Sequence, residues 1–310
     1  MSNKLLVISG LTATSKTSLA IYLAKKFNGE IVSADSRQVY KKLDIGTGKD
    51  ISKIKKARIN VWGYDLVEPK KSFSVGQYIK FARKMISDIQ KRGKLPILVG
   101  GTGLYIKGVV DGIPTAFVPK NNALRKNLMN KSTTELFEIL AQMDSIKAAS
   151  LNTSDRKNPR RLVRAIEVAT YKLSGRGFKF RQPTYDSLFV GLLSSESNLS
   201  KKIDLRVIKR LKQGLEKEVR VLVTSGVKWE SQAMTSLGYR HWREYFEGKT
   251  SKKNTIDLWK SEEKRYAKRQ LVWFKKDKRI NWFDSSARGF KKDVENMVKK
   301  WHNMPDAKKD

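Results

Sequence analysis

The sequence predicts an α/β fold: a core with a parallel sheet, a helical insertion domain and basic C-terminal helices. Short apolar runs alternate with helical patterns before Pro114, which is typical of parallel strands joined by crossover helices. Only helical patterns occur from there to Gln182, and an apolar strand returns at 187–193. The expected divisions are 1–113 for the first part of the core, 114–183 for the insertion, 184–290 for the rest of the core with the basic helices, and 291–310 for a polar, fraying tail.

The individual elements follow from local signals in chain order. Strands are short apolar runs bounded by polar residues, and helices have apolar residues spaced three or four apart. Ser74 and Gln77 form the pattern of a capping box, and Pro159 suits the first turn of a helix opened by Asp155 or Asn158. The expected strands are 5–8, 30–35, 60–67, 95–99, 187–193 and 279–283. The expected helices are 18–27, 74–92, 122–129, 133–142, 145–151, 159–173, 200–224, 231–247 and 255–276.

The first strand leads into a loop with the parts that hold a polyphosphate, as in a P-loop NTPase-like core. Its amides converge at the start of a helix, Lys16 supplies positive charge, and the Thr17 hydroxyl suits Mg²⁺. An ordinary turn rich in Gly and Thr is the alternative, but such a turn does not need Lys16 and Thr17 to open the helix. The residues expected to bind the phosphates are Gly10, Leu11, Thr12, Ala13, Thr14, Ser15, Lys16 and Thr17.

Ser15 departs from the phosphate-loop pattern G-x-x-x-x-G-K-[ST], which has glycine at its position. If the backbone there needs a positive φ, a side chain costs on the order of 1–2 kcal/mol. We expect this cost to weaken the site without abolishing it.

Two further strand ends carry candidate site residues. Asp35 ends the strand 30–35, and Thr102 lies among three glycines after the strand 95–99. Ligands of parallel sheets bind outside the carboxyl ends of strands, so Asp35 is a candidate for chemistry. Its alternative role is to cap the N-terminus of a helix.

The charge balance indicates a polyanionic partner. The chain has 65 Lys and Arg against 30 Asp and Glu, a net charge of +35. Nucleic acid is the favoured partner, and a lysine-rich composition that merely covers solvated faces is the alternative. Between Lys264 and Phe274, basic residues alternate with aromatic ones, as in proteins that bind single-stranded nucleic acid; we nevertheless expect Trp273 and Phe274 to be core residues.

Composition also excludes several classes of site. The chain has no cysteine and only two histidines, His241 and His302. Disulfides, thiolate zinc sites and cysteine nucleophiles are therefore excluded, and a Ser-His triad is disfavoured. No apolar stretch reaches the roughly 20 residues of a membrane span, and the first residues lack the pattern of a signal peptide. We expect a cytoplasmic protein without a membrane partner.

Several stretches, in order along the chain, together resemble the tRNA dimethylallyltransferases, also called tRNA isopentenyltransferases. They cover roughly residues 4 to 284. Each stretch is weakly specific alone, but the ordered set is highly specific. The matching stretches are 10–17, 35–40, 44–49, 100–105, 158–168, 237–240 and 266–270.

The resemblance implies transfer of a dimethylallyl group from dimethylallyl diphosphate to N6 of the adenosine 3′-adjacent to the anticodon of tRNA, with Mg²⁺ at Thr17. It assigns Asp35 as the base for the N6 proton, Thr102 to the same nitrogen, and Lys16 with Arg206 to the leaving diphosphate. The anticodon stem-loop would be gripped by the insertion and the basic C-terminal helices. The tRNA-binding residues it implies are Asp35, Ser36, Arg37, Gln38, Thr102, Arg125, Arg160, Arg161, Leu162, Val163 and Arg164.

Three other functions remain open from the residues alone: an adenylate isopentenyltransferase acting on free nucleotide, an ATP-binding small-molecule kinase, and an inactive tRNA-binding homologue. The basic C-terminal half argues against the first two. Since the principal site residues are present, we expect an active enzyme, and a monomer because one chain carries both binding surfaces. The departures from the family pattern are Leu11 for Pro, Ser15 for Gly, Glu263 for a frequent Thr, and Val272 for Thr.

Overall fold

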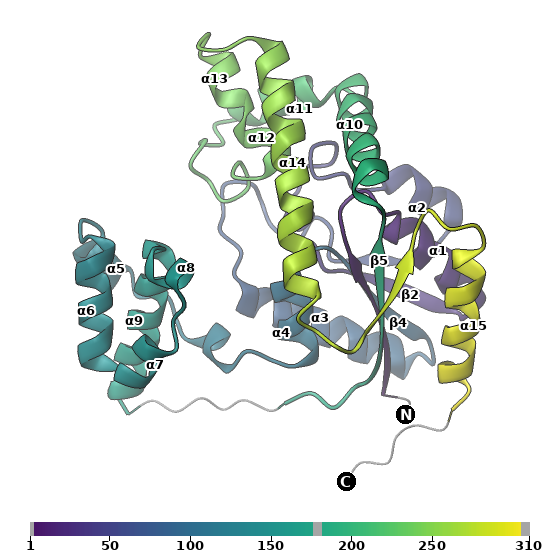
Figure 1. Cartoon of the computed structure of the whole chain (residues 1–310), viewed down its shortest axis with the longest axis horizontal. Helices are drawn as coiled ribbons and strands as arrows, with labels where there is room; N and C mark the ends of the chain where they lie inside the picture. The colour runs from purple at the N-terminus through teal and green to yellow at the C-terminus, as the bar shows by residue number, and fades with distance from the viewer. Residues whose placement is uncertain (1–2, 176–181, 305–310) are drawn as a thin grey trace. The chain divides into compact units, whose positions relative to one another are not determined.

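The computed structural model describes residues 3–175 and 182–304. Its centre is a six-stranded sheet in the order β3-β2-β4-β1-β5-β6, in which every neighbouring pair is parallel (Figure 1). The predicted parallel α/β core is therefore confirmed. The strands are β1 Lys4–Gly10, β2 Gly29–Ser33, β3 Val61–Trp62, β4 Leu95–Val99, β5 Asp186–Leu193 and β6 Ile280–Asp284.

Helices cover both faces of this sheet, because alternate strand residues point to opposite sides. Leu6 and Ile8 of β1 pack with α1 (Lys16–Lys26) and α15 (Phe290–His302). Leu5 and Val7 face the other side, towards α3 (Val75–Lys91) and α4 (Gly103–Val110). All seven residues of β1 are buried as a result.

The C-terminal helices build a second layer above the carboxyl edge of the sheet. The predicted helix 200–224 is two helices, separated at Gly214, whose φ of +94° interrupts the helix. The predicted helix 231–247 is wrong over its first half, since only two short helices form after Ser236. These elements are α10 Glu196–Lys212, α11 Leu215–Thr224, α12 Leu237–Arg240, α13 Trp242–Phe246 and α14 Lys252–Phe274.

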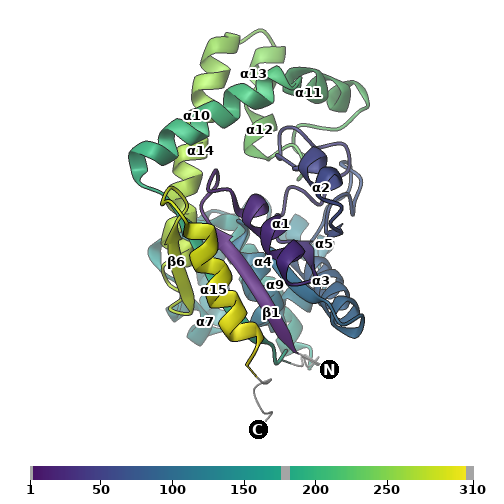
Figure 2. The same cartoon turned by 90° about the vertical axis from the view of Figure 1, so that its right-hand side faces the viewer.

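Two other predictions at the edges of the sheet are corrected. The strand expected over 60–67 is only the two residues of β3, because the backbone turns at Gly63 (φ +99°), directly after Trp62, and again at Asp65 (φ +55°). The expected tail 291–310 is wrong for its first part, where α15 buries Val294 and Val298 and lies beside β1 in Figure 2. Residues 305–310 of that tail lie outside the described residues.

The chain divides into two compact units: residues 1–111 with 183–310, and residues 112–182. The second unit contains the expected insertion helices around its own apolar core, and residues 176–181 of that stretch lie outside the described residues. Asn158 caps its longest helix, α9, with Pro159 in the first turn. The other helical elements are α2 Ile51–Ala57 in the first unit, and η1 Pro114–Phe117, α5 Asn122–Leu128, α6 Thr133–Met143, α7 Ser145–Ala149, α8 Thr153–Arg156 and α9 Pro159–Leu173 in the second.

No helix within 3–175 and 182–304 is both long and apolar enough to cross a membrane.

Candidate active site

A cavity of about 1350 Å³ opens at the carboxyl edge of the sheet, within the first unit. Residues 12–17 after β1, the segment 35–38 after β2 and the start of α4 after β4 all line it, whereas Gly10 and Leu11 of the predicted phosphate-binding set do not. Helices α10, α12 and α14 complete its wall. The three strand ends singled out in the sequence are thus brought together.

The loop 10–17 contains two residues with unusual backbone conformation. Ser15 has φ +62° and ψ +28° and precedes α1 without a side-chain cap. This is the positive φ for which we expected a cost. Ala13 has φ +60°, a second left-handed position that the motif pattern did not reveal. Both are non-glycine residues in a region that L-amino acids rarely adopt.

Lys16 closes the loop on itself. Its Nζ donates hydrogen bonds to the carbonyl oxygens of Gly10, at 3.1 Å, and Leu11. Burial lowers the pKa of Lys16 to about 7, with a further decrease from nearby Arg206 and an opposing increase from Asp35. Arg206 in turn donates to Thr12 Oγ1 at 2.8 Å. Two cations therefore meet at one end of the cavity, where they can bind an anion.

The loop is anchored to its surroundings by its first residues. The Thr12 amide donates to Gln270 Oε1 on α14 at 2.8 Å, and the Leu11 amide donates to the Leu192 carbonyl at 3.1 Å. A proline at position 11 could not form the second bond. The Leu11 side chain instead packs with residues of α10 and α14 in a small apolar cluster.

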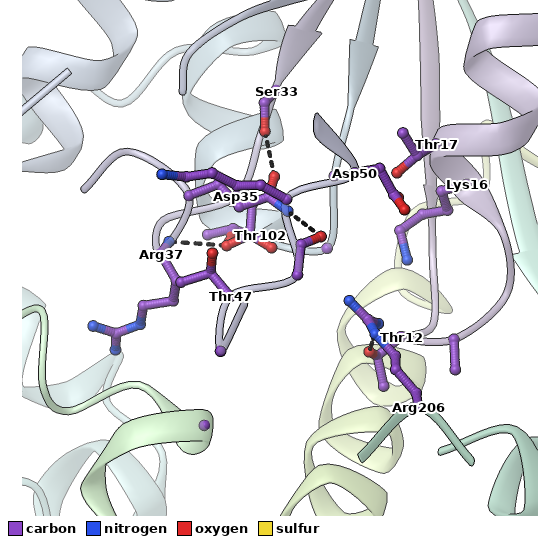
Figure 3. Close-up of a pocket in the computed structure, with 18 of the residues that line it drawn as sticks. Thr12, Lys16, Thr17, Ser33, Asp35, Arg37, Thr47, Asp50, Thr102 and Arg206 are labelled. Carbon is purple, nitrogen blue, oxygen red and sulfur yellow. Dashed lines mark hydrogen bonds between the residues drawn. The ribbon is translucent and has the colours of Figure 1, made fainter. Parts of the chain in front are cut away.

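Asp35 lies on the other side of the cavity from the two cations, together with Thr102 (Figure 3). Its carboxylate accepts a hydrogen bond from the Arg37 amide at 2.8 Å, which fixes the turn after β2. The helix-cap alternative is wrong because turns follow Asp35 and the next helix starts at Ile51. Thr102 Oγ1 accepts from the Ser36 amide at 3.0 Å and so joins the ends of β2 and β4.

Arg37 and Gln38 also line the cavity, but each is held by protein groups. Arg37 donates to the Gln232 carbonyl at 2.6 Å and to Thr235 Oγ1. Gln38 Oε1 accepts from Ser33 at 2.9 Å, and its amide donates to the Gly48 carbonyl at 3.3 Å.

Oxygen donors suited to Mg²⁺ lie at the Lys16 end of the cavity. Thr17 provides a hydroxyl and Asp50 a carboxylate, and both line the cavity (Figure 3). Among residues 3–175 and 182–304 no group of three or more acidic or histidine side chains could hold a metal alone. This donor set fits an ion that is partly held by phosphate oxygens and water, as is usual for Mg²⁺.

In the second unit, the predicted RNA-binding residues differ in their partners. Arg125 and Arg164 both pair with the buried Glu167, with closest approaches of 2.6 and 3.0 Å. Burial alone would raise the pKa of Glu167, but hydrogen bonds from Arg125, from the Asn121 amide and from Arg164 outweigh it and lower the pKa to about 2. These arginines therefore stabilise the unit itself.

The other residues of this segment are arranged differently on α9. Leu162 is fully buried in the core of the unit, so its side chain has no exposed surface with which to contact RNA. Val163 is half-buried against the same core, and Arg161 pairs with Asp155. Arg160 is exposed and makes no ion pair among the described residues.

Several cavity residues escaped the sequence analysis. Trp273 is not a core residue: it is 44% exposed and lines the cavity, whereas Phe274 is buried as expected. Glu263 is buried, pairs with Arg210 at 3.3 Å and accepts from the Trp259 indole at 3.2 Å. Burial and the neighbouring Arg206 lower the pKa of Arg210 to about 10. The only available signal was that Glu263 departs from the family pattern.

Family models and full-length relatives agree on the relationship. The model for IPP transferase matches residues 38–277, and that for isopentenyl transferase matches residues 3–62. A tRNA dimethylallyltransferase of Carboxydothermus hydrogenoformans is 39% identical, with 96% of this chain and 97% of that one covered. One of Anoxybacillus flavithermus is 40% identical, with 92% and 91% covered.

Solved structures give the same result. A tRNA isopentenylpyrophosphate transferase of Bacillus halodurans has a TM-score of 0.74 at 32% identity, covering 97% of each chain. A eukaryotic dimethylallyltransferase acting on tRNA, 23% identical, matches with a TM-score of 0.82 over 99% of this chain and 82% of that chain, which supports the fold. The chain, in which one cavity joins three strand ends, belongs to the tRNA dimethylallyltransferase family.

Proposed function

We propose that this protein transfers the dimethylallyl group of dimethylallyl diphosphate to N6 of the adenosine 3′-adjacent to the anticodon of tRNA. One observation carries the proposal: a carboxylate, Asp35, and a pair of cations, Lys16 and Arg206, line the same cavity. An acceptor base at one end and a diphosphate at the other can therefore reach each other.

The chemistry needs a proton acceptor and a stabilised leaving group. The bond from N6 to the allylic carbon forms as the bond from that carbon to the diphosphate oxygen breaks, and the N6 proton passes to Asp35. Thr102, held by the Ser36 amide, is placed to bind the same amino group. Lys16, Arg206 and the loop amides stabilise the charge on the departing diphosphate.

Thr17 and Asp50 would hold Mg²⁺ with the diphosphate. The ion would neutralise part of the developing negative charge. Their hard oxygen atoms, and the cavity they share with Lys16, support this assignment.

The acceptor adenine is stacked in the anticodon loop and must be extruded to enter a cavity, at a cost of a few kcal/mol. We propose that contacts from the basic surface to phosphates repay this cost, which the net charge of +35 supports. We further propose that the protein acts in the cytoplasm as a monomer, because every residue lining the cavity comes from one unit of one chain.

The first experiment follows labelled dimethylallyl diphosphate into tRNA, AMP or ATP. We expect label in tRNA, and we expect Asp35→Asn to reduce the rate at least about a hundredfold, as loss of a general base does, with little change in tRNA affinity. Asp257→Asn, on the exposed side of α14, is the matched control and should transfer normally. Label in AMP, phosphoryl transfer from ATP, or tRNA binding without transfer by the wild type would contradict the proposal.

A second experiment separates RNA contact from structural support in the second unit. We expect Arg160→Ala to weaken tRNA binding and to lower the dependence of log Kd on log salt by about one. Arg164→Ala should in addition destabilise the protein by about 1.5–3 kcal/mol, because Glu167 loses a charged hydrogen-bond partner. Equal salt dependence for wild type and Arg160→Ala, measured by filter binding, would remove Arg160 from the interface.

A further inference from the structure

Residues 44–49 form a wall of the cavity between the segment after β2 and helix α10. The Gly48 carbonyl accepts from Gln38, three residues beyond Asp35. On its other side, a Cβ built at Gly48 would lie 2.2 Å from an Arg210 Nη2 and 2.6 Å from Arg206 Nη2. The loop 44–49 therefore lies between Gln38 and the two arginines, and Gly48 lies directly against Arg206 and Arg210.

This loop is held by a single carboxylate on α11. Glu218 Oε2 accepts from the amides of Asp44 and Ile45, at 3.0 and 2.9 Å, and Oε1 accepts from the Gly46 amide at 3.0 Å. The Tyr239 hydroxyl donates to the same Oε1 at 2.6 Å. Three consecutive amides and a buried phenol thus converge on one side chain.

Packing leaves the loop little freedom around this anchor. A Cβ at Gly46 would lie 2.4 Å from the Tyr239 ring, so the backbone lies directly on that ring. The far end is held by Lys49, whose enclosed side chain pairs with Asp44 at 2.7 Å and Asp65 at 2.6 Å. A shift of the loop at Glu218 is therefore transmitted to Gly48.

We propose that Glu218 is a positioning residue for the transfer reaction: by holding the amides of 44–46, it keeps Gly48 against Arg206 and so sets the distance between Arg206 and Asp35. The proposal rests on the proposed function, because Arg206 acts there on the diphosphate. Glu218 itself does not line the cavity. It acts through the loop.

The test compares Glu218→Gln with Glu216→Gln, a change on the same helix at a residue that pairs with Lys252 away from the loop. Gln keeps the size of the side chain, but its NH₂ group cannot accept a hydrogen bond, so the groups bonded to the replaced oxygen lose their acceptor. We expect faster hydrogen exchange at residues 44–46, and a fall in kcat/KM for dimethylallyl diphosphate of about tenfold or more, since misplacement of about 1 Å is costly. The KM for tRNA should change less than about twofold, and Glu216→Gln should match wild type.

The outcomes separate this inference from the proposed function. No transfer by the wild type would refute the function, while hydrogen exchange would still test the anchor. Two results for Glu218→Gln would overturn the inference. One is hydrogen exchange at residues 44–46 that is as slow as in the wild type, and the other is faster exchange there with an unchanged kcat/KM. If Glu218→Gln loosens the whole first unit, Tyr239→Phe removes only one hydrogen bond of the cluster. Tyr239→Phe should increase hydrogen exchange at residues 44–46 less than Glu218→Gln does, and it should lower kcat/KM for dimethylallyl diphosphate with little change in the KM for tRNA. Faster exchange at these amides with a normal kcat/KM would again refute the role.

Discussion

Two loops line the cavity and both contact Arg206, but their backbones adopt left-handed conformations in different ways. The loop 10–17 places side chains at left-handed backbone positions, Ala13 and Ser15. The loop 44–49 uses Gly48 at its left-handed position, with φ +69°. The loop 10–17 therefore carries side chains at backbone positions that favour glycine. In the loop 44–49, a side chain at Gly48 would collide with Arg206 and Arg210 unless these moved.

The lysines of the two loops show why. Lys49 pairs with two carboxylates, Asp44 and Asp65, so its positive charge is already neutralised within the protein. Lys16 contacts only carbonyl oxygens, and Arg206 lies nearby. The loop 10–17 therefore has positive charge in excess and gains stability from an anion, whereas the loop 44–49 is a rigid spacer. Under the proposed function, a bound diphosphate would supply interactions that offset the backbone strain at Ala13 and Ser15.

Within this comparison of the two loops, the largest expected effect comes from adding a side chain at Gly48. Gly48→Ala adds a Cβ against the arginines and places alanine at a positive φ, which costs about 1–2 kcal/mol alone. We expect transfer to fall about tenfold or more. The control is Gly93→Ala, which has a similar φ of +68° but no atom within 4 Å, so it reports the backbone cost only. Equal losses in stability and rate for the two variants would show that contact with the arginines is unimportant.

A smaller effect, of opposite sign, is expected in the loop 10–17. Ser15→Gly removes the left-handed strain of about 1–2 kcal/mol but makes the unfolded chain more flexible. We expect a net gain of about 0.5–1 kcal/mol in stability, with tighter diphosphate binding or faster turnover. Ser18→Gly, inside α1, is the same chemical change and should instead cost about 0.5–1 kcal/mol. Thermal unfolding and steady-state kinetics of both variants measure this, and a loss at both positions would remove the strain argument.

The smallest expected effect is the uptake of a fraction of a proton by Lys16 when diphosphate binds. The pKa of Lys16 is about 7 in the folded protein, whereas its ordinary value is 10.5. Between these pH values the unfolded state therefore binds more protons than the folded state. As a result, the contribution of Lys16 to the free energy of unfolding rises with pH from about 7 to 10.5. A bound diphosphate should raise the pKa of Lys16 again. Calorimetry of diphosphate binding at pH 8, in buffers of different ionisation enthalpy, should therefore show proton uptake that is lost in Lys16→Met. Equal uptake by both proteins would contradict the electrostatic difference between the loops.

The sequence was most informative where local chemistry and fold coincide. The strand, loop and helix around Lys16 and the acidic strand end at Asp35 were predictable, because parallel strands bring their carboxyl ends to one edge. The cost at Ser15 was predictable because the motif requires glycine. These features depend on residues close together in the chain.

Features that depend on distant contacts were missed. Trp273 and Phe274 are neighbours in the sequence, and only packing of α14 decides which is buried. The anchor at Glu218 joins residues more than 170 positions apart. The polar composition of 290–302 concealed a helix that needs only Val294 and Val298 on its inner face.

That last helix has a consequence for how the chain acquires its structure. Trp301 of α15 receives a hydrogen bond from Lys4 on its carbonyl and donates one to Asp186, so the end of α15 is bound to the beginning of β1 and β5. Without α15, the apolar side chains of the sheet that pack with Val294 and Val298 would be more exposed to water. One face of the central sheet is therefore completed only when α15, far from β1 in the sequence, packs against it.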